Sequence, residues 1–233
     1  MKTALLSFFC LLLMGWGSAQ TLFAQDVDKL EKSLSAISED LNQKTKEYSW
    51  LLAEAYAEYC EANNKYISWN DFPYMQEIVE FERPASLEVY RLEHKTRKDE
   101  LDKFLNSHKE YKDLKEKQSK AISKTEKDEN ASAFSAFFKK LREEENSYKE
   151  LYYAERKAAC KYRSEALRYI ITRYKEKKEV IPTSYIKYTD LSFLLQKGSK
   201  LDVLKQELST LEELQKDFVQ RIARAKYATP ISE

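Results

Sequence analysis

Glycine is almost missing from this chain. Three glycines occur in 233 residues, and two of them, Gly15 and Gly17, lie close to the N-terminus, so that only Gly198 serves the rest of the chain. Tight β-hairpins and phosphate-binding loops need glycine where φ is positive or where a ligand approaches the backbone closely. The sequence therefore predicts an all-α fold of long helices, and it argues against a nucleotide-binding loop.

The N-terminal segment has the pattern of a secretory signal. Lys2 precedes an apolar run over Ala4–Met14, and small residues follow that run. We interpret residues 1–24 as a cleaved signal peptide, and an uncleaved anchor is the alternative if the apolar segment continues through Leu22-Phe23. We expect residues 25–233 to be exported, to a periplasm or to the outside, with no membrane span after signal cleavage.

Beyond this leader, apolar residues recur at alternating steps of three and four, which is the pattern of helices that pack along a seam. Pro84, Pro182 and Gly198 mark helix ends. We expect an elongated antiparallel, coiled-coil-like bundle in one domain over 25–233. Its parts are three long helices at 26–65, 84–127 and 131–180, a short insert at 74–83, a short element at 185–196, a chain reversal at Asp128–Asn130 in an arm tip at about 106–147, and a C-terminal helix from Ser199.

The charge balance argues against one class of partner. Lysine and arginine together number 40, and aspartate and glutamate number 39. A neutral chain has no electrostatic reason to bind a polyanion, because such binding depends on an excess of basic side chains. We therefore expect no nucleic-acid partner.

Neither a metal centre nor a catalytic triad is indicated. The two histidines, His94 and His108, stand fourteen residues apart on one expected helix. That separation is about 21 Å at 1.5 Å per residue, which is too far for a shared metal ion. Neither histidine belongs to a Glu-x-x-His pair, and the expected register places neither near a cysteine nucleophile. We expect no metal, no cofactor and no catalytic residue, and hence a protein that is not an enzyme.

Two cysteines remain after signal cleavage, Cys60 and Cys160. An even pair in an exported protein indicates a disulfide. Antiparallel packing of the first and third long helices would bring the two residues to similar levels. We predict a disulfide between them, and the alternative is two buried free thiols that pack as small apolar groups.

Aromatic residues are abundant, with 16 tyrosines, 11 phenylalanines and 3 tryptophans. Many lie near the first expected turn and near the far end of the third long helix. Tyrosine rings pack well while their hydroxyl groups stay hydrated, so this end of the bundle is either an aromatic core or a groove for a peptide or a sugar. The candidate groove residues are Tyr66, Trp69, Phe72, Tyr74 and Tyr169.

Three phenylalanines, Phe134, Phe137 and Phe138, follow the expected tip of the arm. The segment before them is strongly charged and offers few residues to cover three rings. If the arm projects, the rings form an exposed apolar patch, which is typical of a contact site for a partner protein. If the arm folds back, they pack on Ile122 and Leu114, or on the last helix.

These patterns predict an exported, non-enzymatic helical protein that binds other proteins, as an envelope scaffold, an adaptor or a holding chaperone. The alternative is a glycan- or small-ligand-binding protein that uses the aromatic end of the bundle. Self-association is a competing interpretation, because the C-terminal helix carries a leucine seam, interrupted only at Gln215, that could pair with a second copy.

Overall fold

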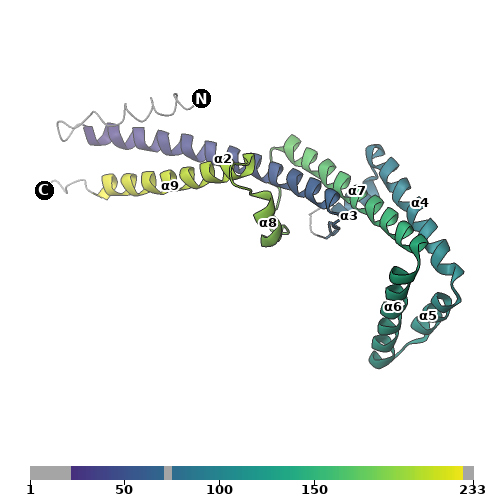
Figure 1. Ribbon diagram of the computed structural model, residues 1–233. Coiled ribbons are helices and arrows are strands. Elements are labelled where there is room, and N and C mark those ends of the chain that lie inside the picture. The colour runs from purple at the N-terminus through teal and green to yellow at the C-terminus, as the bar shows by residue number, and fades with distance from the viewer. Residues whose placement is uncertain (1–21, 71–74, 228–233) are drawn as a thin grey trace. The chain divides into compact units, whose positions relative to one another are not determined.

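The computed structural model describes residues 22–70 and 75–227, and within these ranges every regular element is a helix. The all-α prediction is confirmed. Most of the predicted signal peptide, together with Phe72 and Tyr74, lies outside the described residues. The elements in chain order (Figure 1) are α2 (Leu22–Ala62), α3 (Met75–Glu77), the π-helical turn η1 (Ile78–Glu82), α4 (Ala85–Ser107), α5 (Lys109–Lys120), α6 (Lys124–Glu144), α7 (Asn146–Lys177), α8 (Tyr188–Leu194) and α9 (Lys200–Tyr227).

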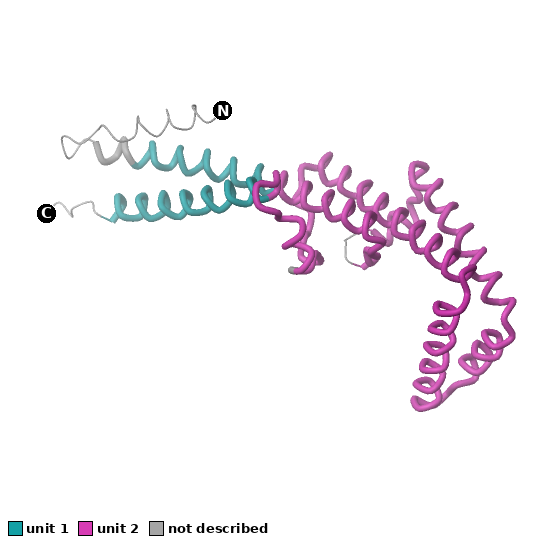
Figure 2. Tube along the Cα trace, viewed as in Figure 1, with its two compact units in different colours: residues 1–45, 202–233 teal, residues 46–201 magenta. Residues whose placement is uncertain are grey.

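The chain divides into two compact units (Figure 2). Unit 1 comprises residues 1–45 and 202–233, and unit 2 comprises residues 46–201. Helix α2 supplies its N-terminal part to unit 1 and its C-terminal part to unit 2. Each unit has its own set of packing contacts.

Unit 1 is an antiparallel pair of helices, formed by the N-terminal part of α2 and by α9. We call this pair the α2–α9 hairpin, although unit 2 separates the two helices in the sequence. Lys226 Nζ lies 2.7 Å from Glu31 Oε1, and Lys44 Nζ lies 2.9 Å from Glu207 Oε2. Residue numbers thus rise along α2 as those of the contacting residues fall along α9, so the two helices run antiparallel, as expected for neighbours in a bundle. The apolar stripes of both helices form the seam between them.

The polar residues that interrupt these stripes have polar partners on the facing helix. Gln215, the one residue out of step in the α9 stripe, donates through Nε2 to Ser38 Oγ at 3.0 Å. Lys44, which breaks the α2 stripe, pairs with Glu207. Polar pairs in an apolar seam favour one register, because a shifted register would place them against apolar side chains. The interruptions therefore fix the alignment of α2 and α9.

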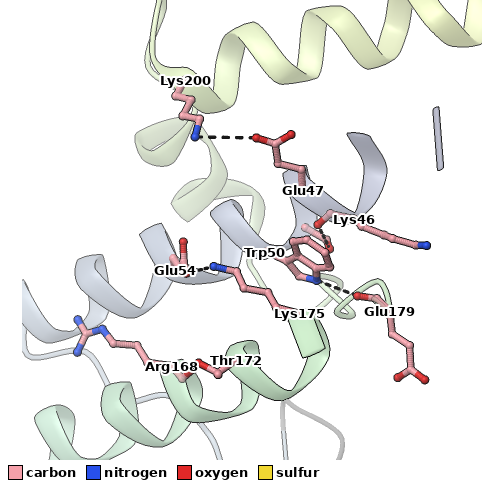
Figure 3. Close-up of polar contacts among 10 residues, drawn as sticks. Lys46, Glu47, Trp50, Glu54, Arg168, Thr172, Lys175, Glu179 and Lys200 are labelled. Carbon is pink, nitrogen blue, oxygen red and sulfur yellow. Dashed lines mark hydrogen bonds and ion pairs between the residues drawn. The ribbon is translucent and has the colours of Figure 1, made fainter. Parts of the chain in front are cut away.

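Helix α7 is central to unit 2, where it packs against both α4 and the C-terminal part of α2. Against α2, Trp50 Nε1 donates to the Glu179 carbonyl oxygen at 2.8 Å, and Lys175 pairs with Glu54 (Figure 3). Helix α4 lies beside α7 (Figure 1). Both neighbours run antiparallel to α7, because residue numbers along α2 and α4 rise as those of the contacting α7 residues fall.

Small residues let α2 and α7 approach closely. Ser164 Oγ donates to the Ala57 carbonyl oxygen on the facing helix at 3.1 Å, which brings backbone and side chain into direct contact between the helices. Around this contact the core is closed by larger apolar side chains. The large core side chains that expose less than 2 % of their surface include Ile67, Met75, Leu167, Ile170, Ile171 and Ile181.

An ion pair connects helix α8 to the loop that follows α2. Lys65, in the loop after α2, contacts Asp190 Oδ1 in the first turn of α8. The Asp190 side chain is 4 % exposed, whereas that of Lys65 is 33 % exposed. The carboxylate is therefore buried and its cation is partly hydrated.

The expected long helices 84–127 and 131–180 are both wrong in their boundaries. The chain leaves the helical conformation at His108, between α4 and α5, and again at Glu145, between α6 and α7. The two breaks face each other, because His108 Nε2 lies 3.2 Å from Glu145 Oε1. Neither break involves proline or glycine, so tertiary packing determines it.

The chain reversal also lies elsewhere than expected. Asp128–Asn130 is helical, within α6, and the turn falls between α5 and α6 at residues 121–123. Ser123 is the N-cap of α6: its hydroxyl accepts from the Glu126 amide, and the Glu126 carboxylate accepts from the Ser123 amide. This capping box satisfies two otherwise unpaired donors, which favours a helix start here over one at Asn130.

Candidate functional site

Unit 1 leaves its apolar seam incompletely covered. Leu204 and Ile222 of α9 are buried, at 6 % and 8 % exposure. Two helices cannot enclose a core between them, and the remaining seam residues are only half-buried. These half-buried side chains are Val27, Leu30, Leu34, Ile37 and Leu41 on α2 and Leu208, Leu211, Leu214 and Phe218 on α9.

A groove of about 380 Å³ runs along one side of this hairpin. Val203, Leu211 and Leu214 are its apolar lining residues. The α9 residues that line it recur at steps of three and four, so they share one face of the helix. Its remaining lining residues are Asp40 and Lys44 of α2 and Gln206, Glu207 and Thr210 of α9.

The edge of the groove carries a fixed ion pair. Lys44 and Glu207 join the two helices across it, and each charge is thereby balanced within the hairpin. Val203, in the apolar lining, is 46 % exposed. The carboxylate of Asp40 is the remaining charged group of the lining. The groove thus combines exposed apolar surface with one ion pair and one further carboxylate, and its apolar part is suited to the apolar face of another helix.

The candidate aromatic groove is only partly assembled in unit 2. Arg163 lies over both rings, 5.2 Å from the centroid of Tyr66 and 4.4 Å from that of Trp69, and Arg156 lies 4.7 Å from the Tyr66 centroid. Trp69 packs edge-on against Tyr162 at 5.5 Å. The structure therefore brings Tyr66 and Trp69 together through arginine.

Tyr169, another candidate, packs against the same core cluster as Trp69. The Tyr66 ring contacts α7 arginines, and the Trp69 ring contacts Arg163 and Tyr162. Burial, followed by the charge of Glu155, raises the pKa of Tyr66 to about 12, so its hydroxyl stays protonated at neutral pH. Ligand binding at this cluster stays a prediction.

The same arginines fasten the loop after α2 to α7. Arg156 Nε donates to the Asn64 carbonyl oxygen at 3.0 Å, and Arg163 donates to that of Ile67. Asn64 has a left-handed backbone, with φ of 48°, which asparagine tolerates better than most residues. Cation–π stacking and carbonyl bonds together give these arginines a structural role.

The three phenylalanines of the arm are packed inside it, and the exposed-patch interpretation is wrong. Phe137 is 3 % exposed, and Phe134 and Phe138 pack against the same cluster. The covering residues are aromatic: Tyr111 of α5 contacts all three rings, and Tyr148 of α7 stacks on Phe138.

The chain therefore folds back, as the alternative stated, but the rings do not pack on Ile122, which is 89 % exposed. Leu114 is a buried member of their cluster. Binding of a partner through Phe134, Phe137 and Phe138 would require this cluster to open. We do not propose it further.

The predicted disulfide is also wrong, because Cys60 and Cys160 are free thiols. Both side chains are fully buried where α2 meets α7. They pack as small apolar groups, which was the alternative. Burial raises the pKa of the Cys60 thiol to about 11, and it also raises the pKa of Cys160.

We expect the two core thiols to be unreactive in the folded protein. Cys10, the third cysteine of the chain, lies in the expected signal peptide and is replaced by serine for this test. In the Cys10→Ser chain, a thiol-specific aromatic disulfide at about pH 8 should label neither Cys60 nor Cys160 until denaturant is added, because the thiolate is scarce and the sulfur is covered. After unfolding without reductant, two thiols per chain should react. Rapid labelling before unfolding would contradict the burial, and no labelling afterwards would contradict the free thiols.

A second pocket, of about 200 Å³, lies beside η1 in unit 2. Ile78 and Ile170 form its floor. Glu82 at its edge already pairs with Arg173. Its other lining residues are Glu77, Tyr174, Lys177 and Glu179. The pocket mixes both signs of charge and does not select one class of ligand.

Two further findings concern the described residues alone. Within 22–70 and 75–227, no group of three or more His, Cys, Asp or Glu side chains is arranged to hold a metal ion. No helix in the same ranges has a stretch apolar enough and long enough to cross a bilayer.

The sequence prediction missed the groove of unit 1. Its signal was present, because Val203 stands beside the leucine seam of the last helix and Leu214 extends that seam toward the same side. Apolar residues next to a seam widen the apolar stripe and indicate a second contact face. The prediction considered the seam alone, and the seam is occupied by α2.

The sequence model of one protein family matches residues 27–229, and that family is described as a domain of unknown function (DUF5039). The match covers all of unit 2, and residues 27–45 and 202–229 of unit 1. No curated protein sequence and no solved structure matches the chain.

Proposed function

The chain belongs to this family of unknown function, DUF5039, and we propose that it is an exported, non-enzymatic helical protein that acts by binding protein partners through the α2–α9 groove of unit 1. An envelope scaffold, an adaptor or a holding chaperone would act in this way. The observation that carries the proposal is the half-buried seam beside an apolar groove.

The half-buried seam can release free energy when a partner covers it. Each apolar side chain that passes from half-buried to buried contributes favourable free energy at about 25 cal/mol per Å². Nine seam residues of unit 1 are half-buried in the isolated chain. A helix laid into the groove would cover part of this surface, whereas in the free chain it faces water.

Shape and charge support the same conclusion. The groove follows α9 over residues 203–214, a length of about 16 Å, or three helical turns. Amphipathic helices bind such grooves through side chains spaced at three and four residues. Lys44 is paired with Glu207, and the remaining charged lining residue, Asp40, is exposed, so its carboxylate can stay hydrated beside an apolar helix.

Export supports the assignment to the envelope. The apolar run behind Lys2, followed by small residues, is the pattern of a signal peptide. N-terminal sequencing of the mature protein should give a start within about residues 20–25. An intact N-terminus in a cytosolic fraction would contradict export.

The partner-binding proposal is tested with a matched pair of valines on α9. Val203, in the groove lining, is 46 % exposed, and Val219 is 51 % exposed. Sixteen residues separate them, which turns Val219 about 160° around the helix from the groove side. Val203→Glu places a charge in the groove, and Val219→Glu places the same charge on the opposite face.

The readout is chemical cross-linking of the tagged chain in its native envelope, followed by mass spectrometry. We expect cross-links from the groove in the wild type and in Val219→Glu, and a loss of at least about tenfold in Val203→Glu, because an unpaired carboxylate disfavours an apolar interface. Circular dichroism should show that both variants keep their helix content. Equal cross-linking in both variants would contradict the proposal.

A further inference from the structure

The partner that fits the groove can be identified from the groove itself, and this inference rests on the proposed function because it uses the same surface. Six residues of α9 line the groove: Val203, Gln206, Glu207, Thr210, Leu211 and Leu214. The intervals between successive members are 3, 1, 3, 1 and 3 residues, so the pattern is the same from either end of the helix. A surface of this kind can face a second copy of itself about a two-fold axis.

Antiparallel pairing of two α9 helices gives chemically matched contacts. With the axis level with Leu208 and Ser209, Val203 of each copy faces Leu214 of the other. Gln206 faces Leu211, and its amide already donates to Asp202 Oδ2 within its own helix at 3.0 Å. The aliphatic stem of Gln206 is therefore the part offered to the leucine.

The charge pattern selects this orientation. In antiparallel pairing Glu207 faces the neutral hydroxyl of Thr210 in the other copy. In parallel pairing Glu207 would face its own counterpart, and like charges placed directly opposite each other disfavour association. Glu207 is also neutralised by Lys44 of its own hairpin at 2.9 Å.

The half-buried seam argues for two added helices rather than one. Seam residues on both α2 and α9 remain half-exposed in the isolated hairpin. Four helices enclose a core of facing apolar positions, whereas two leave one side open. A two-fold axis adds the two helices of a second copy together. A second hairpin supplies both missing helices with the same apolar spacing.

We infer that the partner at this groove is a second copy of this chain, and that two α2–α9 hairpins pack about a two-fold axis into an antiparallel four-helix bundle. Unit 2 is then duplicated in each assembly. Such a dimer would present two copies of every surface of unit 2, which suits a scaffold or an adaptor.

The oligomeric state of the purified chain tests this inference. Sedimentation equilibrium at micromolar concentrations should give a dimer for the wild type and for Val219→Glu. Val203→Glu should weaken dimerisation by at least about 100-fold, since it buries a carboxylate against Leu214. A monomeric wild type would overturn the inference, and so would a dimer that Val203→Glu leaves intact.

Cysteine cross-linking tests the antiparallel register. In a Cys10→Ser background, a chain with both Val203→Cys and Leu214→Cys should form a covalent dimer on oxidation. The two positions on one α9 are about 16 Å apart, so they cannot bridge within one chain. Chains with only one of the two substitutions should not cross-link. Cross-linking of single Leu214→Cys chains would show a different register and overturn the pairing.

The envelope cross-links separate this inference from the proposed function. Groove-dependent links to a second, differently tagged copy support both. Groove-dependent links only to another protein would overturn the inference and leave the proposed function standing. Absence of any groove-dependent link would overturn both.

Discussion

Replacing Lys65 with methionine is expected to lower the free energy of unfolding of unit 2 by about 3 kcal/mol, because it leaves a buried carboxylate without its cation. The Asp190 side chain is 4 % exposed, and its Oδ1 contacts Lys65. Among the described residues, Asp190 Oδ2 is buried without a hydrogen-bond partner. The carboxylate therefore depends on Lys65 more than an exposed one would.

The two members of this pair should respond unequally. Asp190→Leu leaves Lys65, whose side chain is one-third exposed and can turn its ammonium group toward water. We expect this change to cost about 1 kcal/mol. The double variant Lys65→Met/Asp190→Leu should recover to within about 1 kcal/mol of the wild type, since an apolar pair can replace a buried ion pair.

Urea denaturation followed by circular dichroism measures all three values and gives the coupling between the two sites. Lys187→Met is the control, because Lys187 is exposed and precedes the same helix, α8. A loss below about 0.5 kcal/mol for Lys65→Met, the range of ordinary surface changes, would show that the pair does not hold the segment. Additive losses would show that the two residues act independently.

Much of the fold could be predicted from local chemistry. The scarcity of glycine gave the all-α class. Pro84 precedes α4 directly, and Gly198, with φ of 81°, lies just before α9. These residues act through their own backbone, so their effect is visible without knowledge of any neighbour.

The breaks at His108 and Glu145 could not be found in this way. Both residues permit a helix, and their chain breaks lie opposite each other in the fold. Only the packing of the Tyr111–Phe137 cluster explains why the helices end there. By contrast, the turn before α6 had a signal, the Ser123-x-x-Glu126 capping box, which the polar run at Asp128–Asn130 obscured.

In the candidate sites, too, local features could be predicted and features that depend on tertiary packing could not. The sequence identified Tyr66 and Trp69 as neighbours near one turn, and the structure joins them through Arg163. It could not show whether Phe137 is exposed, because its cover comes from Tyr111 and Tyr148 on other segments. A count of charges in a segment does not tell which face carries them, and exposure depends on the face.

Truncating Leu167 to alanine is expected to lower the free energy of unfolding of unit 2 by about 3–4 kcal/mol. Leu167 is fully buried in the core cluster between α7 and its neighbours. Ala53 and Ala166 belong to the same cluster, and alanine side chains cannot move to fill a space. The surrounding helices are also held by Ser164 and by ion pairs, so the cavity should remain largely open.

Two companion variants separate cavity formation from other effects of the substitution. Leu92→Ala removes the same atoms from an α4 position that is 48 % exposed, and it should cost less than about 1 kcal/mol. Leu167→Met keeps most of the volume and should cost less than about 1.5 kcal/mol. If Leu167→Ala and Leu92→Ala destabilised the protein equally in urea, the α2–α7 core would not be close-packed. Close packing of the α2–α7 core would instead be shown by a fixed order of destabilisation, from Leu167→Ala through Leu167→Met to Leu92→Ala. Only the first of these changes opens a large cavity.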